Sequence, residues 1–175
     1  MHNTEDKGWW VIEWRKQEDA FVEEVAPRLN IEAIINPEKQ TNPYAPDLLV
    51  NGELADLKCQ QTPFFKSYVL YKIPNQYAVT FNKKDFLSYK EKYPSIVIYY
   101  WLNWTEISKS IRDIVYTVKP MTGIWRVDFS YLQEIIENQQ THLHTYKRRV
   151  GDSLGNALNS YVLDVRKFQN LYIRE

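Results

Sequence analysis

The sequence has few of the features that mark secreted or membrane proteins. Its 175 residues include a single cysteine, Cys59, which excludes an internal disulfide and fits a reducing compartment. No apolar run approaches the length needed to cross a bilayer. The first residues, MHNTEDKGWW, carry acidic side chains and no apolar signal segment. We therefore expect an intracellular, cytoplasmic protein without a membrane partner.

The sequence also lacks an excess of charge of either sign. Lys and Arg total 22, and Asp and Glu also total 22. A strong non-specific nucleic-acid binder usually carries a basic excess, so the overall balance disfavours that class while leaving room for local basic patches. The apolar content of 44% is ordinary for a globular protein. Since repeats and Gly/Ser linkers are also absent, residues 1–175 are expected to form a single domain.

The order of the periodic segments predicts a mixed α/β domain. Apolar residues recur at the helical period from Val11 to about Asn30, with a kink or interruption expected at Pro27. Further helices are expected over 83–92, capped by Asn82, and over 130–140, capped by Ser130. Strands are expected at 31–35, 47–50, 53–61, 77–81, 95–102, 114–118, 124–129 and 161–165. The continuous apolar character of 95–102 favours a central strand.

The most informative stretch is PDLLVNGELADLK, residues 46–58. Asn51-Gly52 between two apolar runs predicts a hairpin with a type I′ turn, because both central positions of that turn need a positive φ. A two-residue loop pairs Val50 with Glu53 and continues until Asp47 lies opposite Asp56. Their Cβ atoms would then be about 5 Å apart.

Two facing carboxylates repel each other, so this register requires a compensating positive charge. Lys58 and Gln60 point to the same face as Asp56, because side chains alternate along a strand. Lys58 could neutralise one aspartate. A divalent cation would do so more fully, since Mg²⁺ is commonly held by one or two carboxylates together with water and substrate phosphate.

A third acid is expected from the N-terminal helix. Glu18 lies near the middle of the apolar stripe of this helix, where a carboxylate needs a partner. Glu23 and Glu24 lie away from the stripe. The alternative for Glu18 is a surface position in which the side chain reaches out to water, and which of the three glutamates completes the site stays open.

The segment resembles the PD-(D/E)XK nuclease superfamily, which has the restriction-endonuclease-like fold. The matching residues are Pro46-Asp47 and Asp56-Leu57-Lys58, with Glu18 matching a helix acid and Gln60 a polar position found in several branches. The resemblance implies a mixed central sheet flanked by helices, with an α-β-β-β-α-β core. It covers residues 11–102 and leaves 103–175 as a C-terminal extension.

The resemblance implies a metal-dependent endonuclease that hydrolyses the phosphodiester bonds of DNA. Asp47, Asp56, Glu18 and the backbone carbonyl of Leu57 would hold Mg²⁺, with Mn²⁺ as a substitute. Lys58 would position or deprotonate the attacking water and stabilise charge on the phosphate. The expected partner is duplex or branched DNA, and a homodimer is plausible because one site cuts one strand. The alternative is a catalytically inactive protein of the same fold that binds nucleic acid or a protein.

Other residues fit DNA binding less specifically. Gln60, Lys83, Lys84, Lys147, Arg148 and Arg149 are candidate substrate-binding residues. The basic run follows Tyr146, which could stack on a base, and its alternative is a solvated charge run. His142 and His144 would share one side of a strand and are expected to be surface residues rather than metal ligands. Cys59 is expected to be a small core residue that faces away from the site.

Overall fold

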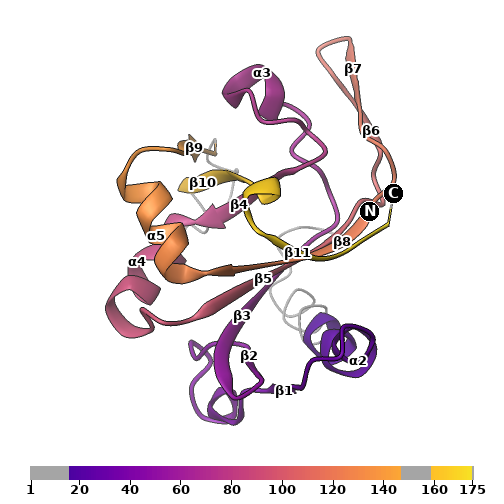
Figure 1. Ribbon diagram of the computed structural model, residues 1–175. Helices are drawn as coiled ribbons and strands as arrows, with labels where there is room; N and C mark the ends of the chain where they lie inside the picture. The colour runs from indigo at the N-terminus through magenta and orange to yellow at the C-terminus, as the bar shows by residue number, and fades with distance from the viewer. Residues whose placement is uncertain (1–15, 147–158, 175) are drawn as a thin grey trace.

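The computed structural model describes residues 16–146 and 159–174. Its centre is a mixed sheet flanked by helices, so the expected mixed α/β class is confirmed (Figure 1). The sheet has six strands in the order β1-β2-β3-β5-β8-β11. Strands β3 and β5 are parallel, and the other neighbours are antiparallel. The strands are β1 (Ala33–Ile35), β2 (Leu48–Val50), β3 (Glu53–Gln60), β5 (Val97–Asn103), β8 (Thr122–Asp128) and β11 (Gln169–Arg174).

Smaller elements surround this sheet. A second sheet has the order β4-β10-β9, and β6 pairs with β7 as a hairpin. These strands are β4 (Ala78–Asn82), β6 (Ser108–Ile111), β7 (Ile114–Thr117), β9 (His142–Thr145) and β10 (Asn159–Asp164). The helices after the N-terminal one are η2 (Pro37–Gln40), α3 (Ser67–Tyr71), α4 (Lys83–Lys92), α5 (Phe129–Glu137) and η3 (Val165–Lys167). In the described part of the chain, the helices are too short or too polar to cross a membrane.

The N-terminal helix accommodates the expected interruption at Pro27 by widening one turn. Residues 16–20 are helical and continue through the π-turn η1 (Phe21–Val25) into α2 (Ala26–Arg28). The N–H of Ala26 donates to the carbonyl of Phe21, five residues back. Proline lacks an N–H and its ring crowds the carbonyl four residues earlier, and the wider turn relieves that conflict. The helix ends before Asn30, which has a φ of 55°.

The hairpin at 48–60 has the register expected from its turn. Leu48 faces Ala55, Leu49 faces Leu54, and Val50 faces Glu53. Asn51 and Gly52 have φ values of 50° and 80°, as the type I′ turn requires. The side chain of Asn51 also accepts a 3.0 Å hydrogen bond from the N–H of Glu32, which fixes the turn against the start of β1.

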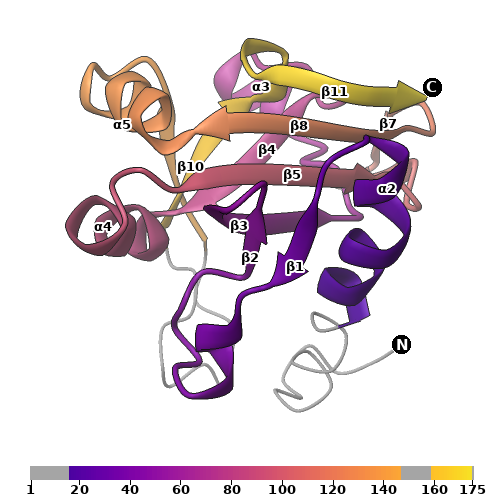
Figure 2. The same cartoon turned by 60° about the horizontal axis from the view of Figure 1, so that its bottom comes forward.

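The two faces of the central sheet carry separate apolar clusters. On one face Phe21 of the N-terminal helix packs with Leu48, Ala55 and Leu57. On the other, residues of α4, α5 and β4 cover Ile98 and further side chains of β5 and β8. Figures 1 and 2 show the N-terminal helix on one side of the sheet and the β4-β10-β9 sheet on the other. Alternate residues of β3 therefore face different surroundings.

Of the two expected helix caps, the one at α4 is confirmed and the one at α5 is wrong. Asn82 caps α4, accepting a 2.8 Å hydrogen bond from the N–H of Lys84. The expected cap at Ser130 is wrong, because α5 already begins at Phe129. Asp128 takes the N-cap position there and makes no side-chain cap bond. Instead its carboxylate lies 2.9 Å from Arg126 Nη2, which explains why it does not turn back to the helix.

Candidate functional site

The site begins where β2 stops and β3 continues. The β2–β3 ladder ends at the pair Leu48–Ala55, while β3 runs on to Gln60. Asp47 immediately precedes β2, and its Oδ2 accepts a 3.1 Å hydrogen bond from the N–H of Leu57. The carboxylate thus takes the place of a strand partner at this edge. The backbone register ends one residue short of the expected Asp47–Asp56 pair.

Asp56 and Lys58 lie on the face of β3 covered by α4. The Asp56 side chain is 5% exposed, and its Oδ1 accepts a 2.7 Å hydrogen bond from the hydroxyl of Tyr89. Its Oδ2 forms a buried ion pair with Lys58 Nζ at 2.8 Å. Lys58 Nζ also lies 2.7 Å from Oδ2 of Asp85, in the first turn of α4. A single ammonium therefore joins two carboxylates.

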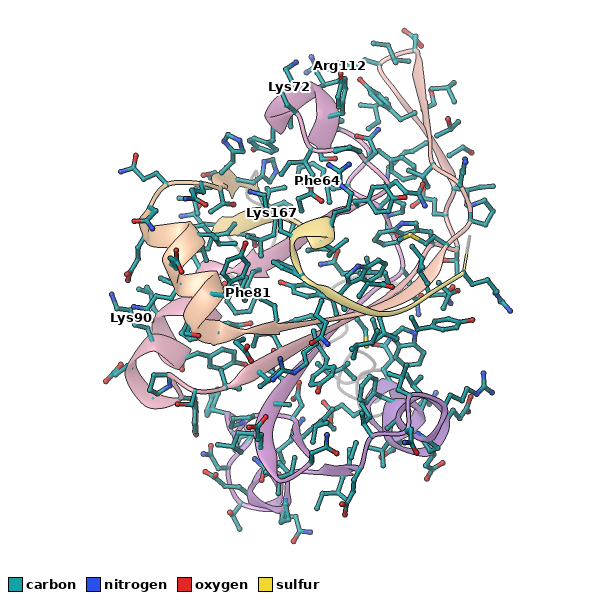
Figure 3. The ribbon with its side chains drawn as sticks, viewed as in Figure 1. Phe64, Lys72, Phe81, Lys90, Arg112 and Lys167 are labelled. Atoms are coloured by element: carbon teal, nitrogen blue, oxygen red, sulfur yellow. The ribbon has the colours of Figure 1, made fainter. Side chains whose placement is uncertain are left out.

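The rings around Lys58 are part of the same arrangement. Its Nζ lies 5.7 Å from the ring centroid of Phe81 and 5.9 Å from that of Tyr89, distances at which a ring face attracts a cation. Figure 3 shows Phe81 in the interior, between the central sheet and the helix α5. The lysine stem is held against apolar surface while its charged end reaches the acids.

Glu18 is also close to the site, and a second lysine accompanies it. Lys39 Nζ lies 2.6 Å from Glu18 Oε1 and 2.6 Å from Asp47 Oδ1. The Glu18 side chain is 12% exposed, so the surface alternative does not hold. Glu23 and Glu24 are exposed, which leaves Glu18 as the glutamate next to Asp47. The partner that a buried carboxylate needs is here an ammonium from η2.

The pKa values reflect an excess of negative charge. Burial raises the pKa of Asp47 to about 8, and the carboxylates of Asp56 and Glu18 add to the rise. Burial also acts to raise the pKa of Asp56, but attraction to Lys58 outweighs it, and the pKa is lowered. The ion pairs of the site join four carboxylates, Glu18, Asp47, Asp56 and Asp85, to two ammonium groups. With all four acids ionised this network would carry two more negative than positive charges, and the raised pKa of Asp47 removes one of those negative charges below about pH 8.

The donor set suits a hard divalent cation in its chemistry. The acids Glu18, Asp47 and Asp56 interact electrostatically beside β3, and carboxylate oxygens are ligands that Mg²⁺ prefers. Within residues 16–146 and 159–174, no three or more His, Cys, Asp or Glu side chains are arranged as a ready metal cage. The Lys39 ammonium lies between Glu18 and Asp47. The Leu57 carbonyl remains a metal ligand only by resemblance.

The candidate substrate-binding residues come from separate parts of the chain. Gln60 Nε2 bonds to Thr80 Oγ1 at 3.2 Å, so its side chain links β3 to β4. Lys83 and Lys84 begin α4, next in sequence to Asp85, and Lys84 is exposed. These lysines are therefore close to the site along the chain. The candidates Lys147, Arg148 and Arg149 lie outside the described residues.

His142 and His144 belong to a surface cluster with an aromatic partner. Tyr71 stacks on His142 with ring centroids 5.0 Å apart, and its hydroxyl lies 2.6 Å from His144 Nδ1. Both histidines share one side of β9, as expected. Cys59 packs in the cluster on the opposite face of β3 from Lys58, in agreement with its expected role as a core residue.

Sequence reasoning missed three contributors to the site. Lys39 lies in a connection without periodicity, and its position depends on how that connection folds. Asp85 and Tyr89 lie on α4 and reach β3 through tertiary packing. One signal was available in the sequence. The acid Asp85 and the aromatic Tyr89 are four residues apart and therefore share one face of the helix.

Comparison with known proteins does not place the chain in a family. No family model matches it, and the searches found no similar curated protein and no similar solved structure. The interpretation of the site therefore rests on the geometry of its own residues.

Proposed function

We propose that this protein is a metal-dependent deoxyribonuclease of the restriction-endonuclease-like fold that hydrolyses phosphodiester bonds. The observation that carries the proposal is the convergence of Asp47, Asp56 and Lys58 at the end of the β2–β3 ladder. Buried acids of like charge lower stability unless something offsets their repulsion. A site that binds a cation during catalysis gives a reason for keeping them.

The excess negative charge supports a divalent ion in particular. Asp47, Asp56 and Glu18 would hold Mg²⁺, or Mn²⁺ in its place, with the Leu57 carbonyl as a further ligand. When bound, such an ion polarises a phosphate and makes a water molecule more acidic. With all four acids ionised, including Asp47, one divalent charge would neutralise the network of four carboxylates and two ammonium groups.

In this proposal one side chain of the protein donates to the phosphate, and two others hold the site residues in position. Lys58, held as an ammonium between Asp56 and Asp85, is suited to donate to a phosphate oxygen as negative charge develops there. Tyr89 fixes the Asp56 carboxylate through its hydroxyl. Asp85 directs the flexible lysine from the first turn of α4, where the helix dipole favours an anion.

The proposed substrate is duplex or branched DNA. Lys83 and Lys84 at the start of α4 are near enough in the chain to contact a phosphate backbone beside the site. The remaining basic candidates, Lys147, Arg148 and Arg149, follow β9. A homodimer, with one site for each strand, is part of the proposal for duplex cleavage.

A second candidate function is binding without catalysis on the same fold. The observation that favours it is a set of exposed apolar side chains on α3, with Tyr68 57%, Val69 52% and Leu70 47% exposed. Such a surface is typical of contacts with a protein or with bases. Binding alone does not require the acids and Lys58 to converge.

A cleavage assay on a panel of nucleic acids distinguishes the two functions. The protein is incubated with supercoiled plasmid, linear duplex, branched DNA and RNA, each with Mg²⁺, Mn²⁺ or EDTA. Lys58→Met removes the ammonium that is proposed to donate to the phosphate. Lys90→Met, in the last turn of α4, is the matched control. Lys90 points outward in Figure 3 and pairs with Glu137 on the surface.

The nuclease proposal requires cleavage that depends on metal, is strongly reduced by Lys58→Met and persists with Lys90→Met. Cleavage of RNA but not of DNA would correct the substrate and keep the chemistry. Equal background cleavage by the wild type and both variants on every substrate would reject the nuclease and leave the binding function.

A further inference from the structure

Lys39 bridges two of the acids that the proposed function assigns to a metal ion. Its Nζ lies 2.6 Å from Glu18 Oε1 and 2.6 Å from Asp47 Oδ1. The two acids come from different elements, the N-terminal helix and the residue before β2, so one ammonium bridges them. Without it, two largely buried carboxylates would face each other unpaired, which is costly.

The loop that carries Lys39 is built to hold it there. Asn36 is 4% exposed, and its backbone N–H donates a 3.0 Å hydrogen bond to the carbonyl of Asp47. Its Nδ2 donates to the carbonyl of Pro46 at 2.9 Å, and its Oδ1 accepts from the N–H of Glu38 at 3.1 Å. One buried side chain therefore caps η2 and closes the loop. Asn36 fixes the start of η2 beside Asp47.

The ammonium itself remains able to leave. The Lys39 side chain is 21% exposed, and its charge is carried on a flexible four-carbon stem. Rotation of that stem would free both carboxylates without moving η2 or the hairpin. The acids are thus assembled in advance, and their oxygens become available when another cation takes the place of the ammonium.

We propose that Lys39 is a resident counter-ion that a divalent metal displaces from Glu18 and Asp47 when the site is loaded. This inference rests on the proposed metal-dependent function and concerns the same acids. Lys39 holds the carboxylates together while metal is absent and weakens metal binding by competing for them. The displaced ammonium remains beside the site and is available to pair with a phosphate of the substrate.

Metal binding by Lys39→Met tests the competition directly. Mn²⁺ binding to the wild type and the variant is measured by titration calorimetry, without substrate. Removing the competing charge is expected to tighten Mn²⁺ binding by about tenfold or more, since the metal no longer breaks two charged hydrogen bonds. Lys39→Arg keeps a competing cation and is expected to bind more weakly than Lys39→Met.

Two controls locate the effect. Lys90→Met removes an ammonium from a surface ion pair with Glu137 and should bind Mn²⁺ as the wild type does. Adding Asp47→Asn to Lys39→Met should abolish the gain, because it removes a ligand that both cations use. Circular dichroism establishes that each variant is folded before binding is compared.

A measurement on the wild-type protein avoids dependence on any variant. The reaction of Lys39 with an amine-acylating reagent is followed by mass spectrometry with and without Mn²⁺. Displacement predicts faster labelling of Lys39 when Mn²⁺ is present, with Lys90 labelling unchanged.

The outcomes separate the two proposals. Tighter Mn²⁺ binding by Lys39→Met together with faster labelling of Lys39 supports the exchange. Equal or weaker binding by Lys39→Met, or slower labelling with Mn²⁺, overturns the exchange while the metal-dependent function stands. Absence of Mn²⁺ binding in both proteins overturns the metal-dependent function, and the exchange with it.

Discussion

The hydroxyl of Tyr89 donates a 2.7 Å hydrogen bond to Oδ1 of Asp56, joining the buried face of α4 to the strand β3. Tyr89 is 9% exposed and Asp56 is 3% exposed, so water does not readily replace this bond. The acid is thereby held in one orientation. The site consequently depends on the packing of α4 as well as on the hairpin.

Tyr89→Phe tests this dependence. The change leaves the ring packing in place but removes the donor to a buried carboxylate, which should lower the free energy of unfolding by about 1–3 kcal/mol. Urea unfolding measures the loss. Tyr93→Phe, at the residue that directly follows α4, is the control and should change stability by less than about 0.5 kcal/mol. Equal effects of the two changes would contradict a specific role for the Tyr89 hydroxyl.

Asp85→Asn should impair Lys58 without unfolding the protein. The carboxylate lies 2.7 Å from Lys58 Nζ and its side chain is 32% exposed, so its loss costs little stability. A poorly directed lysine should lower kcat by about tenfold or more with KM little changed. In the double variant with Lys58→Met, the Asp85 change should have no further effect on kcat. Independent, additive losses would show that Asp85 acts by another route.

The raised pKa of Asp47 predicts how stability depends on pH. The ordinary value of 3.8 applies to the unfolded chain, and the folded value is about 8. Between these values the folded protein binds more protons than the unfolded chain, so this group makes stability fall as pH rises toward 8. The slope should flatten above that pH.

Asp47→Asn isolates this contribution, because asparagine can still accept the hydrogen bond from the N–H of Leu57. The variant should lose less stability than the wild type as the pH is raised from 5 to 8. Urea unfolding at several pH values gives the two slopes. Identical slopes would mean that Asp47 does not hold its proton in the folded state.

Gly123→Ala tests the packing that supports the centre of the sheet. A Cβ at this position of β8 would lie 2.3 Å from two ring atoms of Trp125, which is 2% exposed. Relief requires the ring to move within a packed core, at a cost of about 1–3 kcal/mol. Thermal unfolding measures the loss. With Trp125→Leu already present, Gly123→Ala should cost less than it does alone, and an undiminished cost would place the conflict elsewhere.

The hairpin could be predicted because its information is local. Asn51-Gly52 fixes the turn, the turn fixes the register, and the register brings the segment before β2 beside Asp56. The order of helix, strands, helix and strand, from the N-terminal helix to β5, followed from periodicity. Asn82 as a cap of α4 is another short-range feature that was correctly predicted.

The features that could not be predicted from the sequence depend on contacts between residues that are distant along the chain. Lys39 reaches Glu18 only after the loop closed by Asn36 has folded, and 21 positions separate the two residues. Strand β9 was not predicted because its neighbours are β10 and the aromatic surface of α3, which are remote in sequence. Strand β11 is largely exposed, and its residues do not alternate between buried and exposed. It is recognised as a strand chiefly by its pairing with β8.

We propose that the acids and the lysine on β3 hydrolyse phosphodiester bonds. The most direct measurement is the Mg²⁺-dependent rate at which the purified protein nicks supercoiled plasmid, compared with Asp56→Asn and with the surface control Glu91→Gln on α4. We expect a loss of at least about a hundredfold for Asp56→Asn and no loss for Glu91→Gln. Equal rates for all three proteins, or nicking that persists in EDTA, would contradict it.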